Sequence, residues 1–374
     1  MKIKTELTRE DHSHRSDYHW RCTQANDHEK LNAAYNRFTG QNRTLEQYLW
    51  QWVKTPFEPS ESWVLEYTRT GEIVGHHGVM YLPFTQRGES IGGGKTENTF
   101  IDRHHAPKVF YLALEKKALQ AMQNRFVYIY TTAPYAGKGA VGLIRKKLGY
   151  QPLGVMATCC LQLRPSAVKT LMQERYPQLS RVAGPLAIGQ SMVQGFIWLV
   201  NALRSVGVQV KDLSWENLPA VSEFWEKHKS CYGVTVDRTL AYLRWRLQEN
   251  PYITYSLVEI RHQTKVLGYA VLKERLMPVN NEVIEIMSIE DLIVAQAREE
   301  NFFLCLAALN RKYLFKNVIV KTLLQDDALN RAIRRLQHYL RKWYVKPGPE
   351  LLAWSREGNA IPWYFTNILL EGII

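Results

Sequence analysis

Two clusters of glycine and lysine are the first stretches of this chain whose residue types suggest chemistry. The segment GESIGGGKT ends in Gly94-Lys95-Thr96, as a phosphate-binding loop does, but the glycine needed five residues before Gly94 is Glu89. The cluster also precedes a predicted strand, whereas a phosphate loop follows a strand and opens a helix. We therefore predict a hairpin turn here. The segment AGKGA does precede a predicted helix, so its Lys138 could contact an anionic ligand, although an ordinary flexible loop is favoured.

Carboxylate and imidazole side chains within predicted strands are the candidates for proton transfer. Glu97 lies in the run KTENTFI, where a carboxylate can act as a general base or serve as a structural group of the sheet. His76 and His77 are neighbours in another strand-like run, so they must face opposite sides and at most one can point into a cleft. Histidines near the N-terminus fit a solvated polar tail better than a metal site, and we predict no metal.

The elements that must position these residues belong to a chain of 374 residues, a length that points to two domains. Hydrophobic residues make up 46% and charged residues 22%, which excludes wholesale disorder and disulfide scaffolds. The formal net charge of +13 favours anionic partners without choosing among them. The five cysteines include no CxxC pair, and the polar N-terminal segment does not resemble an export signal, so we expect a cytoplasmic protein.

One uncharged segment, residues 183–203, is long enough to cross a bilayer. Polar residues interrupt it, and Gly184 and Pro185 stand at its start. We favour a buried linker helix. The alternative is an interfacial helix, which would place the protein at the inner face of a membrane.

An internal repeat organises the rest of the chain. Sliding the sequence against itself by 193 positions predicts that two halves share one plan of strands and helices. The segments around the matches agree in type, as in TENTFI and IEDLIV. The matching pairs are Trp52 with Trp245, Glu66 with Glu259, Gly75 with Gly268, Glu97 with Glu290, and Phe110 with Phe303.

The order of predicted elements resembles the GNAT superfamily of N-acyltransferases, and particular segments carry the likeness. YHWRCTQANDHEKLNAAY resembles the family's opening strand and helix, WVLEYTRTGEIVGHHGVMYLPF its central meander, TENTFIDRHHAPKVFYLALEKKAL its acyl-CoA strand and helix, and LIRKKLGYQPLG its last helix and turn. The likeness covers residues 18–163 and, more weakly, a second copy. It implies an α/β fold of two GNAT-like domains, each with a mixed, mostly antiparallel sheet flanked by helices. The expected divisions are a polar tail (1–16), a first domain (17–165), a linker with the uncharged helix (166–206) and a second, degenerate domain (207–374).

The resemblance also implies where an acyl-CoA would bind. In the family, the strands equivalent to residues 95–101 and 126–130 separate to admit the pantetheine arm, and the pyrophosphate lies over the next helix N-terminus. The residues placed there are Phe100, Ile101, His105, Ala106, Lys108, Val109 and Lys138.

This chain departs from the family at two places. The loop at residues 104–108 has no glycine, and its Pro107 offers no N–H donor. The position of the family's tyrosine general acid, four residues before Gly149, is Arg145 here. Tyr135 or Tyr130 could substitute for that tyrosine, and we predict Tyr135, with Glu97 as the base.

We therefore expect an enzyme that transfers an acyl group from acetyl-CoA, or another acyl-CoA, to an amine such as an amino sugar. The resemblance to two-copy members associated with cell-envelope polysaccharide assembly suggests that acceptor. Two alternatives stay open. One is an aminoacyl transferase of the peptidoglycan-bridge type, which would hold charged transfer RNA through its positive charge. The other is a catalytically dead GNAT-like scaffold.

Overall fold

The computed structural model describes residues 17–102, 104–105, 109–133, 140–175, 177–179, 182–279, 282–337, 345–356, 358 and 361–370. The strands are β1 (Tyr18–Cys22), β2 (Glu61–Tyr67), β3 (Glu72–Gln86), β4 (Glu89–Ile101), β5 (Tyr128–Ala133), β6 (Gln151–Gln162), β7 (Val208–Leu213), β8 (Val234–Val236), β9 (Ser256–His262), β10 (Lys265–Val279), β11 (Glu282–Val294), β12 (Asn317–Leu323) and β13 (Val345–Ser355). The helices are α2 (His28–Thr39), α3 (Leu45–Trp52), α4 (Val109–Met122), α5 (Ala140–Lys147), α6 (Pro165–Arg175), α7 (Ala183–Arg204), α8 (Leu218–His228), α9 (Leu240–Leu243), α10 (Glu299–Lys312), α11 (Ala328–Gln337) and α13 (Asn367–Leu370).

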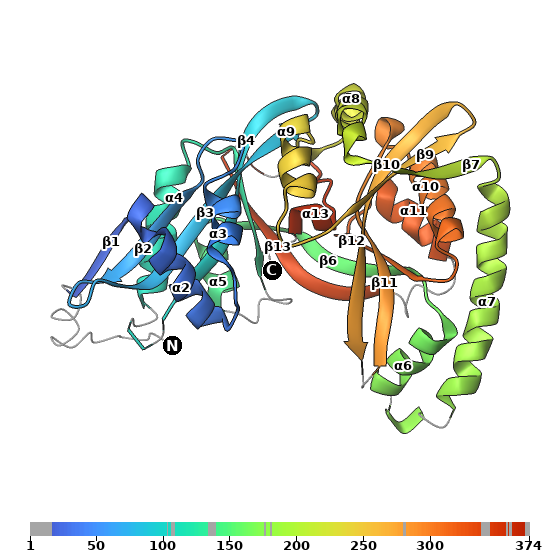
Figure 1. Ribbon diagram of the computed structural model, residues 1–374, viewed down its shortest axis with the longest axis horizontal. Helices are drawn as coiled ribbons and strands as arrows, with labels where there is room; N and C mark the ends of the chain where they lie inside the picture. The colour runs from blue at the N-terminus through green and yellow to red at the C-terminus, as the bar shows by residue number, and fades with distance from the viewer. Residues whose placement is uncertain are drawn as a thin grey trace.

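The described strands join in one continuous sheet with the order β1-β2-β3-β4-β5-β13-β6-β12-β11-β10-β9-β7, and β8 pairs with β3. The β4–β5 and β11–β12 pairs are parallel, and the other pairs in this order are antiparallel. Figure 1 shows the sheet running across the molecule with helices around it. The predicted α/β class, with a mixed and mostly antiparallel sheet flanked by helices, is confirmed.

Strands of equal length recur at the predicted offset. β3 and β10 are both 15 residues long and begin 193 residues apart, at Glu72 and Lys265. β4 and β11 are both 13 residues long and begin 193 apart, at Glu89 and Glu282. Before these strands the offset is 195, because the turn between β9 and β10 is two residues shorter than the turn between β2 and β3.

This change of offset corrects two of the predicted residue pairs. Gly75 pairs with Leu65 and Gly268 with Ile260, so Glu66 and Glu259 are not equivalent positions. The tryptophans are shifted in the same way, because Trp50 rather than Trp52 is the counterpart of Trp245. The Trp50 and Trp245 rings stack with centroids 4.9 Å apart, and each indole N–H donates to the other's carbonyl oxygen at 3.2 Å.

The last strands of the two halves are exchanged. β13, from the C-terminal half, lies between β5 and β6, whereas β6, from the N-terminal half, pairs with β12. β6 and β13 also pair with each other. Each half therefore completes its sheet with a strand from the other half, as Figure 1 shows at the centre of the molecule.

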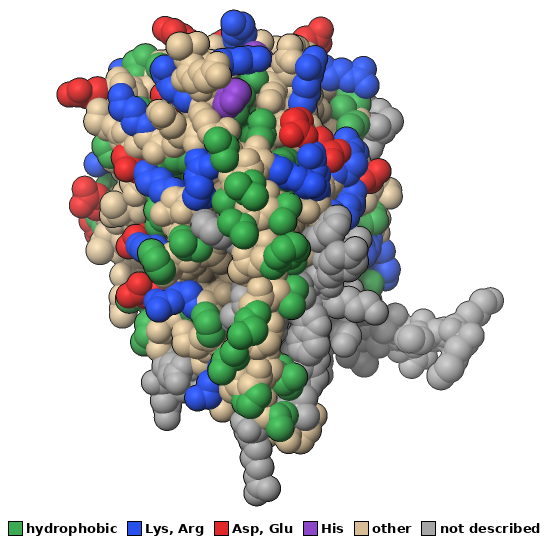
Figure 2. All heavy atoms as spheres, turned by 90° about the vertical axis from the view of Figure 1, so that its right-hand side faces the viewer, with side chains coloured by type: hydrophobic (Ala, Val, Ile, Leu, Met, Phe, Trp, Pro, Cys, Tyr) green, Lys and Arg blue, Asp and Glu red, His purple; other side chains and the backbone are tan. Residues whose placement is uncertain are grey.

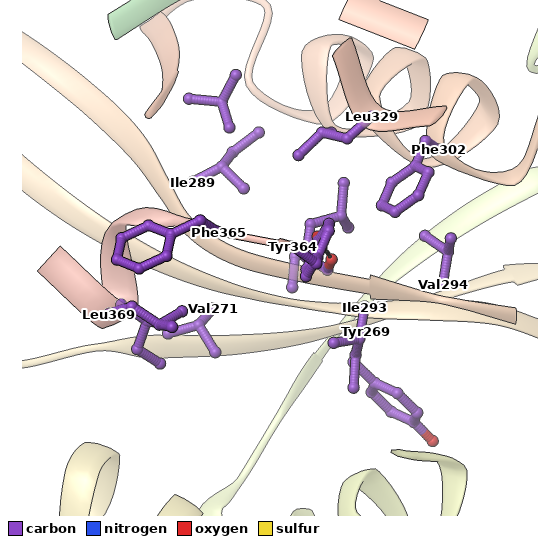
Figure 3. Packing of buried hydrophobic residues seen from close by; sticks show 14 of the residues in the cluster. Tyr269, Val271, Ile289, Ile293, Val294, Phe302, Leu329, Tyr364, Phe365 and Leu369 are labelled. Carbon is purple, nitrogen blue, oxygen red and sulfur yellow. Dashed lines mark hydrogen bonds between the residues drawn. The ribbon is translucent and has the colours of Figure 1, made fainter. Parts of the chain in front are cut away.

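The largest hydrophobic core extends across both halves. It includes Trp50 from α3, Tyr130 from β5, and aromatic residues of the C-terminal segment that fill the space beside the joined strands. Figure 3 shows Tyr364 and Phe365 packed among residues of β11 and of the helices α10 and α11. Burying such large aromatic side chains is a main source of stability, so the C-terminal segment is an integral part of the fold.

The predicted hairpin turn is present at the start of the segment GESIGGGKT, whereas the glycines at 92–94 lie inside strand β4. The turn is formed earlier by Arg87 and Gly88, whose φ angles are 53° and 93°. Gly93 then lies in β4 beside Phe84 of β3. A Cβ atom at Gly93 would come within 2.2 Å of the Phe84 ring, so the missing side chain makes room for this aromatic residue.

The uncharged segment forms the long helix α7 at one end of the molecule, and Figure 2 shows apolar side chains gathered along its outer face. Met192 and Phe196 are 72% and 68% exposed. The inner face packs on α6 through Ala183 and Ala187, and Asn201 donates to the carbonyl oxygen of Leu336 at 3.4 Å. Among the described helices, α7 included, none combines the length and the apolar character needed to cross a membrane.

Candidate functional site

The parallel pairing of β4 and β5 stops part of the way along both strands. It joins Gly93 to Tyr128, Gly94 to Ile129 and Lys95 to Tyr130. β4 then continues for six residues and β5 for three without pairing to each other. The two strands therefore separate in the region where the resemblance predicts that a thioester arm enters.

A bulge in β4 lies within this separated region. The register of β3 and β4 shifts between His76 and Gly78, and Asn98 adopts a φ of 52°. Asparagine tolerates this left-handed conformation better than most residues. A bulge of this kind bends the strand and redirects its side chains, so Glu97 and Asn98 are presented on the side of the sheet covered by α2 and α3.

On the opposite face, a buried charged cluster joins α4 and α5 behind the separated strands. The Arg145 guanidinium donates to Oε1 of Glu115 through Nε at 3.1 Å and Nη2 at 2.8 Å, and it also donates to the Thr131 hydroxyl on β5. Tyr111 donates to the same Glu115 oxygen at 2.5 Å. His77 Nδ1 lies 3.5 Å from Glu115. Burial raises the pKa of Glu115, but His77 and Arg145 outweigh it and leave this pKa below its usual value.

Arg145 occupies the position where the resemblance expects a tyrosine general acid. Its ion pair is almost completely buried, with side-chain exposures of 5% for Arg145 and 1% for Glu115. A guanidinium held in this way does not give up a proton. We conclude that the cluster positions α4 and α5 relative to β5, and that any acid for a leaving group must come from another residue.

Glu97 lies on the other face of β4 and is only half-buried. It forms an ion pair with Lys95 of the same strand. Its charge also acts on the nearby Tyr130 and Arg43. The equivalent residue in the second half, Glu290, is fully buried and pairs with Arg275 at 2.9 Å. Glu290 is thus a structural carboxylate of the second half, whereas Glu97 in the first half lies in a more open environment.

The remaining predicted site residues are placed as follows. Phe100 packs against α2, with its ring stacked on Phe38 at 5.0 Å, so its side chain belongs to the core. Ile101 packs against the cluster around Leu65. His105 lies 3.9 Å from Glu72, and its carbonyl oxygen accepts from a tyrosine hydroxyl. Val109 begins α4. Outside the described residues lie Ala106, Lys108, Tyr135 and Lys138.

The structure adds a residue that the sequence analysis did not select. Arg43 is 4% exposed and lies over the ring of Tyr35, with its Cζ atom 4.0 Å from the ring centroid. Tyr252 of the second half lies in the same surroundings, because the charge of each group, Arg43 and Tyr252, acts on the pKa of the other. The available signal was the repeated triplet Arg-Thr-Leu, at residues 43–45 and 238–240.

Among its described residues, the second half carries carboxylates at the helix start next to its own separated strands. β11 and β12 also pair over a short stretch, ending at Ile289 and Val320. The first turn of α10 carries Glu299 and Glu300, where an anion would be repelled, and these residues pair with arginines of α11. This arrangement favours a structural or acceptor-shaping role for the second half.

One buried atom tests whether the separated strands of the first half suit a thioester arm. The hydroxyl of Thr96, the first residue of β4 beyond the pairing with β5, is buried and has no partner among the described residues. Polar groups in such positions are usually satisfied. The unpaired backbone of β4 and this hydroxyl can therefore bond to an amide-rich arm, so the residues present fit the arm of acyl-CoA.

Comparison with solved structures agrees with this geometry. No protein-family model matches the chain, and no curated protein matches it in sequence. The fold is that of the GCN5-related N-acetyltransferases. A probable N-acyltransferase from Enterococcus faecalis superposes with a TM-score of 0.60 and 11% identity, over 91% of this chain and 73% of that one.

Two further structures show the same fold. A GCN5-related N-acetyltransferase from Anabaena variabilis has a TM-score of 0.55 and 13% identity, over 90% of this chain and 72% of that one. Eis1 from Mycobacterium abscessus has a TM-score of 0.51 and 13% identity, over 89% and 72%. At these identities the likeness concerns the fold.

Proposed function

We propose that the protein is an acyl-CoA-dependent N-acyltransferase whose donor site lies between β4 and β5. The observation that carries this proposal is the end of the parallel pairing after Lys95 and Tyr130. The unpartnered hydroxyl of Thr96 lies at that point and supports it. Acetyl-CoA is the expected donor, and an amino sugar is the expected acceptor.

The reaction forms a bond between the acceptor nitrogen and the acyl carbon and breaks the bond from that carbon to sulfur. The attacking amine must be uncharged, so a proton leaves it, directly or through a water. We assign this proton to Glu97, because it is the half-buried carboxylate beside the separated strands. Backbone N–H groups of β4 would stabilise the negative charge on the carbonyl oxygen. The sulfur takes up a proton as it leaves, and the assignment of Tyr135 to this step remains a prediction.

The donor site can be tested by thermal unfolding with acetyl-CoA. A ligand present at 100 times its dissociation constant stabilises the native state by about 2.7 kcal/mol. For a chain of 374 residues this corresponds to a rise of roughly 3 to 4 °C in the unfolding midpoint. Adenosine 3′,5′-bisphosphate is the control, because it carries phosphates without the thioester arm. Equal stabilisation by both compounds, or none by acetyl-CoA, would refute the proposed donor site.

The role of Glu97 needs a separate measurement. We expect Glu97→Gln to lower the rate of CoA release by at least about 100-fold, since a general base contributes on this order, while stabilisation by acetyl-CoA is retained. Glu89→Gln is the matched control, because Glu89 is exposed at the start of the same strand. An unchanged rate in the Glu97 variant would contradict its assignment. Stabilisation by aminoacylated transfer RNA in place of acetyl-CoA would support the other transferase class.

A further inference from the structure

Two buried arginines occupy equivalent positions in the two halves. Arg43 and Arg238 each precede a threonine that caps the following helix. Thr44 accepts a hydrogen bond from the backbone N–H of Gln47, and Thr239 accepts one from Tyr242. The offset of 195 is the one that relates Trp50 to Trp245.

Arg238 is completely satisfied by groups of its own half. Its Nε and Nη2 atoms donate to the two carboxylate oxygens of Asp291, at 3.0 and 3.1 Å. Its Nη1 donates to the Thr235 hydroxyl at 2.8 Å and to the Val236 carbonyl oxygen at 2.7 Å. In the second half, therefore, the carboxylate of Asp291 balances the charge of the buried arginine.

Arg43 lacks that carboxylate. The residue equivalent to Asp291 is Asn98, 193 positions earlier. With its amide oxygen directed toward the donors, Asn98 accepts from Arg43 Nη1 at 2.7 Å and from Trp52 Nε1 at 3.0 Å. This keeps a hydrogen bond but removes the negative charge. Within the described residues, no carboxylate pairs with Arg43, and its Nη2 atom is buried without a partner.

Another donor near Arg43 is also unsatisfied. The Gln51 side-chain nitrogen is buried and has no hydrogen-bond partner among the described residues, and the Tyr252 hydroxyl is buried close to the guanidinium. Gln51 is joined to Arg43 through its oxygen, at 3.2 Å. A set of donors without acceptors complements an anion, because an unpaired buried charge is strongly unfavourable.

The charges nearby decide which anion fits. Lys95 and Glu97 neutralise each other as an ion pair, which leaves the single positive charge of Arg43. A carboxylate carries one negative charge, whereas a phosphate monoester carries between about 1.5 and 2 at pH 7. The excess would be repelled by Glu97. Arg43 itself is buried, but Glu97, Asn98 and Tyr252 around it are half-buried, so the group lies close to the surface.

We propose that Arg43 binds a carboxylate of the amine acceptor through its Nη2 atom, beside the Asn98 side chain that replaces the aspartate of the second half. This inference rests on the proposed function, and it deepens that function by naming the acceptor class as an amine that also bears a carboxylate. Arg43 fixes the acceptor near Glu97, and the acceptor's carboxylate balances a buried positive charge that has neutral partners, among them Asn32 at 2.7 Å, but no carboxylate partner among the described residues.

The test uses three hexosamines that differ at carbon 6: glucosamine, glucosamine 6-phosphate and 2-amino-2-deoxyglucuronic acid. By calorimetry, we expect the acid to bind about 10- to 100-fold tighter than glucosamine, the range that a hydrogen bond to a charged group contributes. Asn98→Asp introduces the internal carboxylate, and aspartate tolerates the backbone conformation at this position. We expect this variant to bind the acid and glucosamine equally and to unfold at a higher temperature.

Asn42→Asp is the matched control. Asn42 is exposed and adjacent to Arg43 in the chain, so the substitution adds the same charge outside the buried cluster. We expect it to keep the preference for the acid. Arg43→Gln should abolish the preference for the acid over glucosamine, and this variant provides the test if Asn98→Asp does not fold. The proposal is overturned if the wild type does not bind the acid more tightly than glucosamine, if the phosphate binds tightest, or if Asn98→Asp retains the preference. Stabilisation by acetyl-CoA, measured on the same samples, reports on the donor site separately.

Discussion

Replacing Glu115 with glutamine tests the buried cluster that joins α4 and α5. The substitution keeps the size of the side chain but removes the negative charge opposite Arg145. Both side chains are at most 5% exposed, and two donor atoms of Arg145 lie 2.8 and 3.1 Å from one carboxylate oxygen. Breaking a buried pair by removing one partner costs about 3–5 kcal/mol. For a protein of this size, the unfolding midpoint should fall by roughly 4 to 6 °C.

Urea denaturation followed by tryptophan fluorescence would measure this loss. Glu299→Gln is the control, because Glu299 lies 2.9 Å from Arg331 but both side chains are more than one third exposed. It should cost less than about 1 kcal/mol. The double variant Glu115→Gln with Arg145→Gln should be less destabilised than the sum of the single variants. A loss below about 1 kcal/mol for Glu115→Gln would show that the ion pair does not hold the two helices.

Two other predictions concern acid stability and the outer face of α7. Burial lowers the pKa of His76 to about 3 and of His77 to about 4, from 6.5. The unfolded chain therefore binds more protons than the folded one at acidic pH. The two neutral histidines contribute fully to the free energy of unfolding above about pH 6.5. This contribution decreases as the pH falls, and at full protonation the loss is roughly 5 kcal/mol for His76 and 3 kcal/mol for His77. Urea denaturation between pH 7.5 and 5 would check this, and a flat profile would contradict it. Phe196→Gln should change the unfolding free energy by less than about 0.5 kcal/mol, because this ring is already 68% exposed. A larger loss in the same assay would mean that the ring packs against the protein.

Local patterns in the sequence were enough to predict the fold class. Alternating apolar residues marked the strands, and the repeat at 193 positions located β3, β4 and their counterparts. The place of Gly92, Gly93 and Gly94 inside β4 was not predicted, because glycine is usually depleted in strands. Their place in the strand depends on Phe84, whose ring needs the space beside Gly93. That requirement is visible only when the two strands lie side by side.

The candidate site was predicted only in part, because some of its residues matter through contacts that form only in the folded structure. Glu97 was selected because its strand and its counterpart could be recognised from sequence. Arg43 was missed because its significance lies in its relation to Asn98, 55 positions later, and in the ion pair formed by Arg238 and Asp291. The insertion of β13 beside β5 likewise has no local signal, since it depends on pairing between segments that are far apart in the chain.

The exchange of β6 and β13 sets the order in which this chain can fold during synthesis. β13 begins 183 residues after the end of β6, from residue 162 to residue 345. At about 5–20 residues per second, roughly 10 to 40 seconds pass before the ribosome has made the strand that covers β5. Throughout that time the edge of β5 that β13 covers is without this partner, and an unpaired strand edge is a template for aggregation. A chain cut before β13 therefore leaves β5 without this partner strand, although β6 can still pair with β12.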